Sequence, residues 1–300
     1  MQEQMKWIVA VMAGMFCLSL STPVMATAVV TVQNSGTGPK EVLLFQPSHP
    51  RAQTLAMVWK METKNKLGEM EIPMDLPPVE ATFSVTSLPQ TNEEEAHYSM
   101  KVLGVSFKMD ESDLPAELLA STEQGMKELV GVVTEGVLLN NGQHRKVDLP
   151  SGVEAHSMLE QFGSAMSNSV VVFPKIPVGV GAKWTYTEVI EQNGFRFDRS
   201  TDVEIKSIDG SRIEMALSHG GKPLTDSFNA PGLPSGTTAK LASFMLEGKG
   251  TLVCDLNELF PVKSVMDIQM LMTLKIKTDG VTEAIDSEID MASHIDLSSQ

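Results

Sequence analysis

The feature that most constrains the fold is a strict two-residue alternation of apolar and polar side chains near the C-terminus. It runs through Val262–Lys277 and again through Glu283–Leu297. The apolar positions are Met266, Ile268, Met270, Met272, Leu274 and Ile276 in the first segment, and Ile285, Ile289, Met291, Ile295 and Leu297 in the second. Because successive side chains of a strand point to opposite faces, this pattern predicts two strands, each with one buried and one solvated face. Thr278-Asp279-Gly280 between them is typical of a tight turn, so we expect a long antiparallel hairpin with a methionine-rich apolar face.

Most of the remaining chain also alternates as strands do. We expect strands over 55–62, 79–88, 97–107, 132–139, 183–191, 195–207, 211–218 and 244–256. Three turns between them have hairpin composition: Asn140-Asn141-Gly142, Asn193-Gly194 and Asp209-Gly210. The alternation changes parity at Gly104, which predicts a β-bulge that bends the sheet. Pro73, Pro77 and Pro78 argue against a central strand in their stretch, because proline donates no ladder hydrogen bond.

Two segments have a helical period instead. Asp110–Val130 places its apolar residues on one stripe, with Ser112 as a plausible N-cap. A second helix is expected after Pro150, where Ser151 and Glu154 have capping-box spacing, and a short third helix is expected over Thr237–Met245. The chain is therefore predicted to be mostly β within the α+β class, with a curved antiparallel sheet or half-barrel and inserted helices.

The order of strands, helix and strands occurs twice along the chain. We interpret residues 51–150 as a first β-rich half with a helix, and residues 151–300 as a second β-rich half that ends in the long hairpin. This order suggests a duplicated β-meander, although any single meander with an inserted helix would look similar. Residues 27–50 form the predicted flexible leader, because Thr27–Lys40 is small, polar and contains glycine.

The first 26 residues have the organisation of a secretory signal peptide. Lys6 provides a basic n-region, Trp7–Leu20 is apolar, and Val24-Met25-Ala26 fits the small-residue rule, so we expect cleavage after Ala26. The alternative is an N-terminal anchor that is never cleaved. Phe16 precedes Cys17, which argues against lipidation at that cysteine. The expected location is periplasmic or secreted, with no stable membrane span after cleavage.

Charge and cysteine content restrict the function further. The net charge is −15, and such an acidic surface repels phosphate backbones, so nucleic acid is not an expected partner. Cleavage would leave Cys254 as the single cysteine, which we interpret as a small buried hydrophobe; a reactive thiol is the alternative. The chain has 20 methionines but only 5% aromatic residues, and methionine fills irregular apolar space or adapts to varied ligands.

One motif gives a family resemblance. Pro177-Val-Gly-x-Gly-x-x-Trp184, followed by three strands, Gly248-x-Gly250 and an alternating methionine-rich hairpin, resembles uncharacterised secreted bacterial proteins grouped as a domain of unknown function. The resemblance covers about Phe173 to the C-terminus. More distantly, the order of strands and inserted helix is similar to the curved half-barrel of periplasmic lipoprotein carriers of the LolA type. That likeness concerns the fold, and a fold does not determine a function.

The sequence contains no recognised catalytic motif. It has no Gly-x-Ser-x-Gly, His-Glu-x-x-His or Cys-x-x-Cys motif, and its six histidines are scattered singly, as surface or turn residues would be. The best metal candidate is the polar side of the last strand, formed by Asp286, Glu288, Asp290, His294 and Asp296. A flat strand cannot surround an ion alone, so we interpret this row as a solvated strand face, and expect neither a metal site nor a cofactor.

Three functional hypotheses follow. The first is a non-enzymatic binding module whose concave sheet holds a hydrophobic small molecule, such as a lipid or acyl chain. Its expected apolar lining is Met266, Met270, Met272, Leu274 and Phe244. The second is an interaction or structural protein of the cell envelope whose sheet is covered by its own helices. The third, a hydrolase, has the least support from the sequence.

Overall fold

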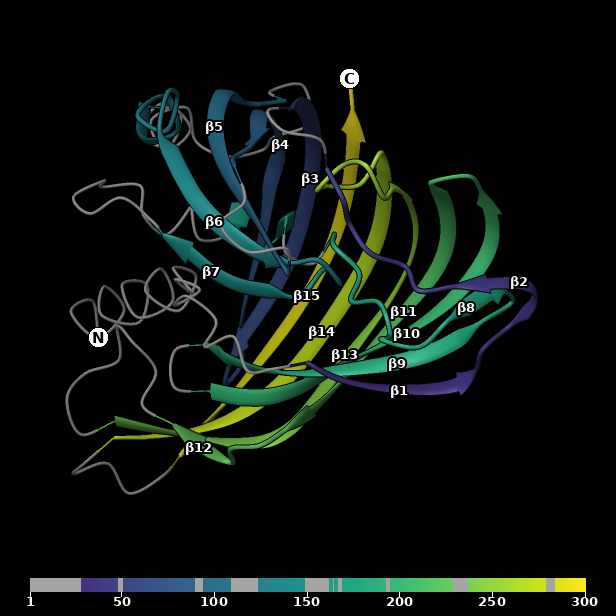
Figure 1. The fold of residues 1–300 in the computed structure, drawn as a ribbon. Coiled ribbons are helices and arrows are strands. Elements are labelled where there is room, and N and C mark those ends of the chain that lie inside the picture. Colours follow the sequence, from purple (N-terminus) through teal and green to yellow (C-terminus); the bar gives the residue numbers. More distant parts are fainter. Residues whose placement is uncertain are drawn as a thin grey trace.

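The computed structural model shows a single large, curved antiparallel sheet. It describes residues 28–47, 51–89, 94–108, 124–148, 162–163, 165–166, 169–192, 195–228, 237–278 and 284–300. In this part of the chain the fold is mostly β, as predicted, and the sheet is open, with β1 and β7 at the two ends of its strand order (Figure 1). A two-stranded sheet of β2 and β8 lies beside it.

The strands of the first part of the chain are β1 (Val29–Asn34), β2 (Thr37–Glu41), β3 (Ala52–Leu67), β4 (Met70–Ser87), β5 (Glu95–Phe107), β6 (Val133–Leu139) and β7 (His144–Asp148). The strands of the second part are β8 (Val178–Val180), β9 (Lys183–Gln192), β10 (Phe195–Asp209), β11 (Arg212–Pro223), β12 (Ser227–Phe228), β13 (Thr237–Asp255), β14 (Lys263–Thr278) and β15 (Ile285–Ser299).

The predicted terminal hairpin is confirmed and lies near the middle of the sheet. The strand order is β1-β9-β10-β11-β13-β14-β15-β3-β4-β5-β6-β7. β14 pairs with β15 from Lys263↔Ser298 to Ile276↔Ile285, and β15 pairs in turn with β3. The C-terminal strand therefore joins the two halves of the chain into one surface, with every second side chain of the hairpin on the concave face.

Bulges contribute to the curvature of the sheet. In β5 the pairing shifts from Gly104 opposite Thr82 to Val102 opposite Phe83, which confirms the bulge predicted from the parity change. The extra residue keeps apolar side chains on the concave side before and after the shift. Figure 1 shows β6 and β7, at one end of the sheet, curving toward β9 and β1 at the other.

The prolines of β4 lie where the sheet tolerates them. The first part of β4 pairs with β3, including Pro73 opposite Lys64, whereas its pairing with β5 begins only at Val79. A second bulge, opposite Lys60, accommodates Pro77 and Pro78. The first part of β4 is therefore a strand but not a central one, because β3 is its only neighbour among the described strands.

Two predicted segments need correction. Thr237–Met245, expected to be helical, is the first part of β13. Pairing with β14 from Thr237↔Thr278 onward supplies its backbone hydrogen bonds, and one extra residue, Ala242, is absorbed as a bulge. The leader also contains strand, because β1 pairs with β9 through its β-branched run from Val29 and forms one edge of the sheet.

The expected helices lie largely outside the described residues. Of the first, residues 124–130 are described; 124–127 are helical and 128–130 form a turn. Of the second, 162–163 and 165–166 are described and helical. The signal peptide and the turn at Asp279-Gly280 lie outside the described residues as well.

Candidate functional site

The concave face of the sheet carries two separate apolar clusters. The first, the inner cluster, is a two-layer core. Its second layer comes from segments between strands: Leu43, Phe45, Met126, Leu129, Phe162, Ala165, Met166, Val170, Val171, Val172, Phe173, Leu259 and Phe260. These residues pack on strand side chains, for example Phe173 on Trp184 with ring centroids 6.2 Å apart and Phe260 on Tyr98 at 5.2 Å. The Trp184 indole also donates to the Val172 carbonyl over 2.9 Å. This half of the face is filled by the protein itself.

The second, the outer cluster, has a different construction. Its buried members are Phe195, Phe197, Ala239, Met272, Leu274, Ile276 and Ile289, with Leu67, Ile190, Leu241, Phe244 and Leu246 packed around them. Among the described residues, all of these belong to strands of the sheet. Phe195, Phe197 and Phe244 form an aromatic group with centroid separations of 5.2 to 5.6 Å. The described members of the outer cluster are therefore strand residues alone, and its seven buried members are 0–8% exposed.

The sequence-predicted lining residues all lie on the concave face but divide between the two clusters. Phe244 is directly opposite Met272 in the β13–β14 ladder, and Leu274 is the next inward residue along β14. Met270 is buried and lies between the clusters. Met266, by contrast, is 1% exposed within the inner cluster. The structure brings Met272, Leu274 and Phe244 together in the outer cluster, assigns Met266 to the filled inner cluster, and leaves Met270 in neither.

A band of polar residues crosses the concave face between the clusters. We define the polar belt as Glu188 on β9, Arg199 and Thr201 on β10, His219 on β11, and His144 on β7. The guanidinium of Arg199 donates to Glu188 over 2.8 Å, and the two side chains are 17% and 20% exposed. Thr201 Oγ1 lies 3.0 Å from His219 Nδ1. The β10–β11 register places Thr201 and His219 opposite each other.

Glycine provides the space for the belt. Gly248 of β13 lies opposite His219 in the β11–β13 ladder. A Cβ atom at Gly248 would lie 3.2 Å from the His219 ring and 3.0 Å from the Asp267 carbonyl oxygen. This is tighter than ordinary side-chain contact, so a side chain here would compete with the imidazole for space. The imidazole can lie against the strand because the glycine has no side chain.

Burial determines the protonation of the belt. Burial, together with the smaller effect of the positive charge of Arg199, lowers the pKa of His144 and of His219 from 6.5 to about 4. Both imidazoles are therefore neutral at pH 7. Burial also raises the pKa of Tyr186 to about 12, so its hydroxyl keeps its proton beside Thr201. The residues just before β7 lie beside β9, because the Phe173 amide donates to the Asn141 carbonyl over 2.8 Å and Phe173 packs on Trp184. The charge of Arg199 acts on His144, His219 and Tyr186 alike, in keeping with this placement.

The belt contains unsatisfied hydrogen-bonding capacity. Among the described residues, neither ring nitrogen of His144 has a hydrogen-bond partner, and neither does Nε2 of His219. The two histidines are 7% and 8% exposed. Buried polar groups are normally paired, and an unpaired one costs about 1–3 kcal/mol. The expectation that all six histidines are surface or turn residues is therefore wrong for His144 and His219.

A signal for the belt was present in the sequence. His219 continues the inward parity of Ile213, Met215 and Leu217, so it interrupts an apolar row at its end. Arg199 and Thr201 interrupt the inward row of β10 in the same way, between the Phe195–Phe197 pair and the Val203–Ile205 pair. Polar residues at inward positions on neighbouring strands would have indicated a polar band, but only once the strand register was known.

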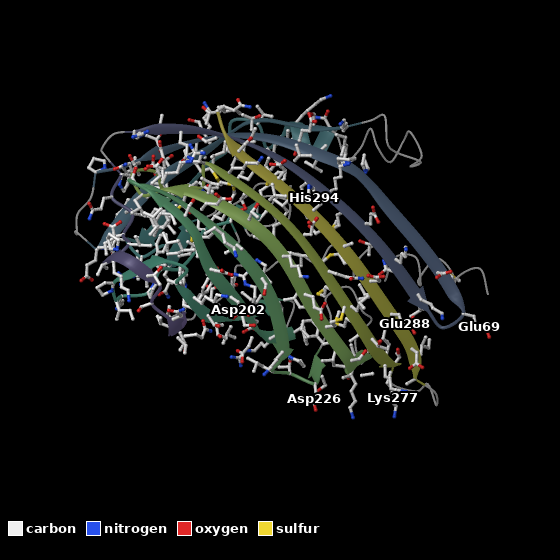
Figure 2. All side chains as sticks on the ribbon, turned by 90° about the vertical axis from the view of Figure 1, so that its right-hand side faces the viewer. Glu69, Asp202, Asp226, Lys277, Glu288 and His294 are labelled. Carbon is white, nitrogen blue, oxygen red and sulfur yellow. The ribbon has the colours of Figure 1, made fainter. Side chains whose placement is uncertain are left out.

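The acidic row of β15 lies on the opposite, convex face (Figure 2). Its members meet basic or polar side chains of the adjacent strands. His294 Nδ1 lies 2.6 Å from Asp267 Oδ1, Lys275 lies 3.4 Å from Asp286, and the register places Glu288 opposite Lys66. Within the described residues, no group of three or more histidine, cysteine, aspartate or glutamate side chains is arranged to hold a metal ion.

Cys254 has the predicted character. It is a free thiol, 1% exposed, and burial raises its pKa to about 12. It therefore packs as an apolar residue and is not a nucleophile at neutral pH.

Comparisons with known proteins do not assign the chain to a family. Neither a model of a known protein family nor a curated protein matches this chain. In the described part of the chain, no helix has both the length and the apolar composition to cross a membrane. The function has to be inferred from the concave face itself.

Proposed function

We propose that the protein is an exported, non-enzymatic binding module that holds a hydrophobic ligand, such as a lipid or an acyl chain, against the outer cluster. The observation that carries this proposal is the continuous apolar face that the outer cluster forms on the concave side, made by strand side chains that include methionine and three phenylalanine rings. The inner cluster is filled by described segments between strands, whereas the described members of the outer cluster are all strand residues.

The dimensions and composition of the outer cluster suit a chain-like ligand. From Met270 to Ile276 the inward face of β14 extends over six residues, or about 20 Å. That is similar to the length of one acyl chain, since two opposed chains form a membrane core of about 30 Å. Met270 and Met272 contribute flexible side chains that adapt to an irregular ligand surface. The aromatic group around Phe244 supplies a large apolar wall.

Export is part of the same proposal. We propose that Met1–Ala26 is a signal peptide cleaved after Ala26, and that the mature chain is periplasmic or secreted. The acidic composition and the buried single thiol of Cys254 suit such a location without a disulfide. We also propose that the chain is related to the secreted domains of unknown function and that its fold is similar to that of the lipoprotein carriers. The two halves of the chain are proposed to be copies of one β-meander. The support for a duplication is the strand order, because each half of the chain forms an antiparallel meander.

The test is to extract the purified protein with organic solvent and to identify what is released by mass spectrometry. We expect a lipid or another apolar molecule in amounts comparable to the protein. Met272→Gln, on the concave face, should release less, whereas Thr273→Gln, its neighbour on the convex face, should release as much as the unchanged protein. Empty extracts, together with no binding of added lipid, would contradict the proposal.

An empty extract would instead support an interaction or structural protein of the envelope whose concave face is covered by the chain itself. A screen of hydrolase substrates, with and without divalent metal ions, tests the non-enzymatic part of the proposal. Turnover that depends on His219 would overturn that part.

A further inference from the structure

The hydrogen-bonding groups of the polar belt indicate which class of hydrophobic ligand the concave face would bind. The belt adjoins the outer cluster: along β10, Phe195 and Phe197 are followed on the same face by Arg199 and Thr201. A chain-like ligand lying along the outer cluster would have one end at the belt. The belt therefore meets whatever group that end carries.

The hydrogen bonds of the belt define what His219 offers to a ligand. The Tyr186 hydroxyl keeps its proton and interacts with Thr201, and Thr201 hydrogen-bonds His219 Nδ1. If each hydroxyl donates to the next group, Nδ1 accepts and the imidazole proton lies on Nε2. Nε2 is the buried nitrogen that lacks a partner among the described residues. In that arrangement His219 presents a donor, and His144, as a neutral imidazole, presents one donor and one acceptor.

The charge of the belt favours an uncharged group. The positive charge of Arg199 is matched by Glu188 at 2.8 Å, and both imidazoles are neutral at pH 7. The described belt has no net charge to compensate a buried carboxylate or phosphate, and burying an uncompensated charge is costly. A hydroxyl can accept from one imidazole and donate to another without carrying charge.

We propose that the polar belt is the head-group site for a single-chain amphiphile with a hydroxyl head, such as a long-chain alcohol or a monoacylglycerol, whose tail lies on the outer cluster. This inference rests on the proposed function, because the tail requires the outer cluster. It adds a second determinant of binding, made by His219 and His144 and independent of tail burial.

The experiment compares four probes of equal chain length: 1-dodecanol, its methyl ether, dodecanoate and dodecane. Their binding to the full chain, stripped of bound lipid, is measured at about pH 7.5 by displacement of a neutral fluorescent dye. The ether accepts a hydrogen bond but cannot donate one, and dodecane does neither. We expect dodecanol to bind most tightly, the ether more weakly, and dodecanoate more weakly than dodecanol.

Variants separate the head site from the tail site. His219→Leu should weaken dodecanol binding about tenfold, the loss of about one hydrogen bond, and leave dodecane binding unchanged. His144→Leu is a second variant with the same expected direction, and it removes no hydrogen bond of the ligand-free protein. His294→Leu on the convex face is the matched control, with unchanged binding of all four probes. Urea unfolding midpoints confirm that each variant is folded.

The outcomes distinguish the two proposals. Equal affinity for all four probes, in the unchanged protein and in both belt variants, would overturn the head-group site and leave the hydrophobic binding function standing. Tighter binding of dodecanoate than of dodecanol would also overturn it, because the belt would then favour an anion. Failure of every probe to bind would overturn the proposed function itself.

Discussion

Replacing His144 with leucine tests the electrostatic account of the belt, because this imidazole is buried with both nitrogens unpaired among the described residues. An unpaired buried polar group destabilises a protein by about 1–3 kcal/mol. Leucine is of similar size and needs no hydrogen bond. In the lipid-free protein at about pH 7.5, His144→Leu should therefore raise the free energy of unfolding by about 1–2 kcal/mol.

The same substitution should change the pH dependence of stability. Burial, aided by the charge of Arg199, lowers the pKa of His144 from 6.5 to about 4. Between these values the unfolded chain binds a proton that the folded protein does not, so stability is present above pH 6.5 and is lost as the pH falls toward 4. The loss is about 2 kcal/mol per histidine at pH 5, and His219, with the same shift, contributes a similar amount. Glu188 and Tyr186 are the other titratable groups that face the belt.

The assay is urea unfolding at about pH 7.5 and pH 5, followed by tryptophan fluorescence. The stability advantage of His144→Leu over the unchanged protein should grow by about 2 kcal/mol between the two pH values. His294→Gln, which removes a histidine from an exposed ion pair, serves as the control and should alter stability by less than about 1 kcal/mol. An advantage that is the same at both pH values, or a variant less stable at both, would refute the argument.

Two further predictions concern packing. A Cβ atom at Gly136 would lie 2.3 Å from the Tyr98 ring, so Gly136→Ala should destabilise the protein by about 1–3 kcal/mol. The control is Gly104→Ala, whose Cβ atom enters open space and should change stability by less than about 1 kcal/mol. Thermal unfolding of the two variants measures the difference. Trp184→Phe removes the hydrogen bond to Val172 and leaves a buried carbonyl unpaired, so the free energy of unfolding in urea should fall by about 2 kcal/mol. An unchanged free energy would show that this bond does not stabilise the packing of Val172 on the sheet.

Periodicity predicted most of the sheet because each strand has one apolar and one polar face. The alternation from Met266 to Ile276 correctly assigned these side chains to the buried face, and the parity change at Gly104 located a bulge. The helix expected over Thr237–Met245 failed for a physical reason. Short mixed segments have no decisive period, and the neighbouring strand β14 determined the conformation.

The candidate site was only partly predictable. Met272, Leu274 and Phe244 lie together because they share strand parity in a paired register, and the parity can be read from alternation. Met266 has the same parity but lies farther along β14, where inserted segments cover the face, and no local pattern shows that difference. The belt was missed because it joins β7 with β9, β10 and β11, and this proximity depends on the curvature of the whole sheet.

The most direct test of ligand binding on the outer cluster uses nuclear magnetic resonance of protein labelled with 13C at the methionine methyl groups. The signals of Met270 and Met272, assigned by Met270→Leu and Met272→Leu, should move as 1-dodecanol is added. Those of Met57 and Met215, buried in the inner cluster, should stay in place. Movement at Met57 and Met215 without movement at Met272, or no movement at saturating alcohol, would contradict the account.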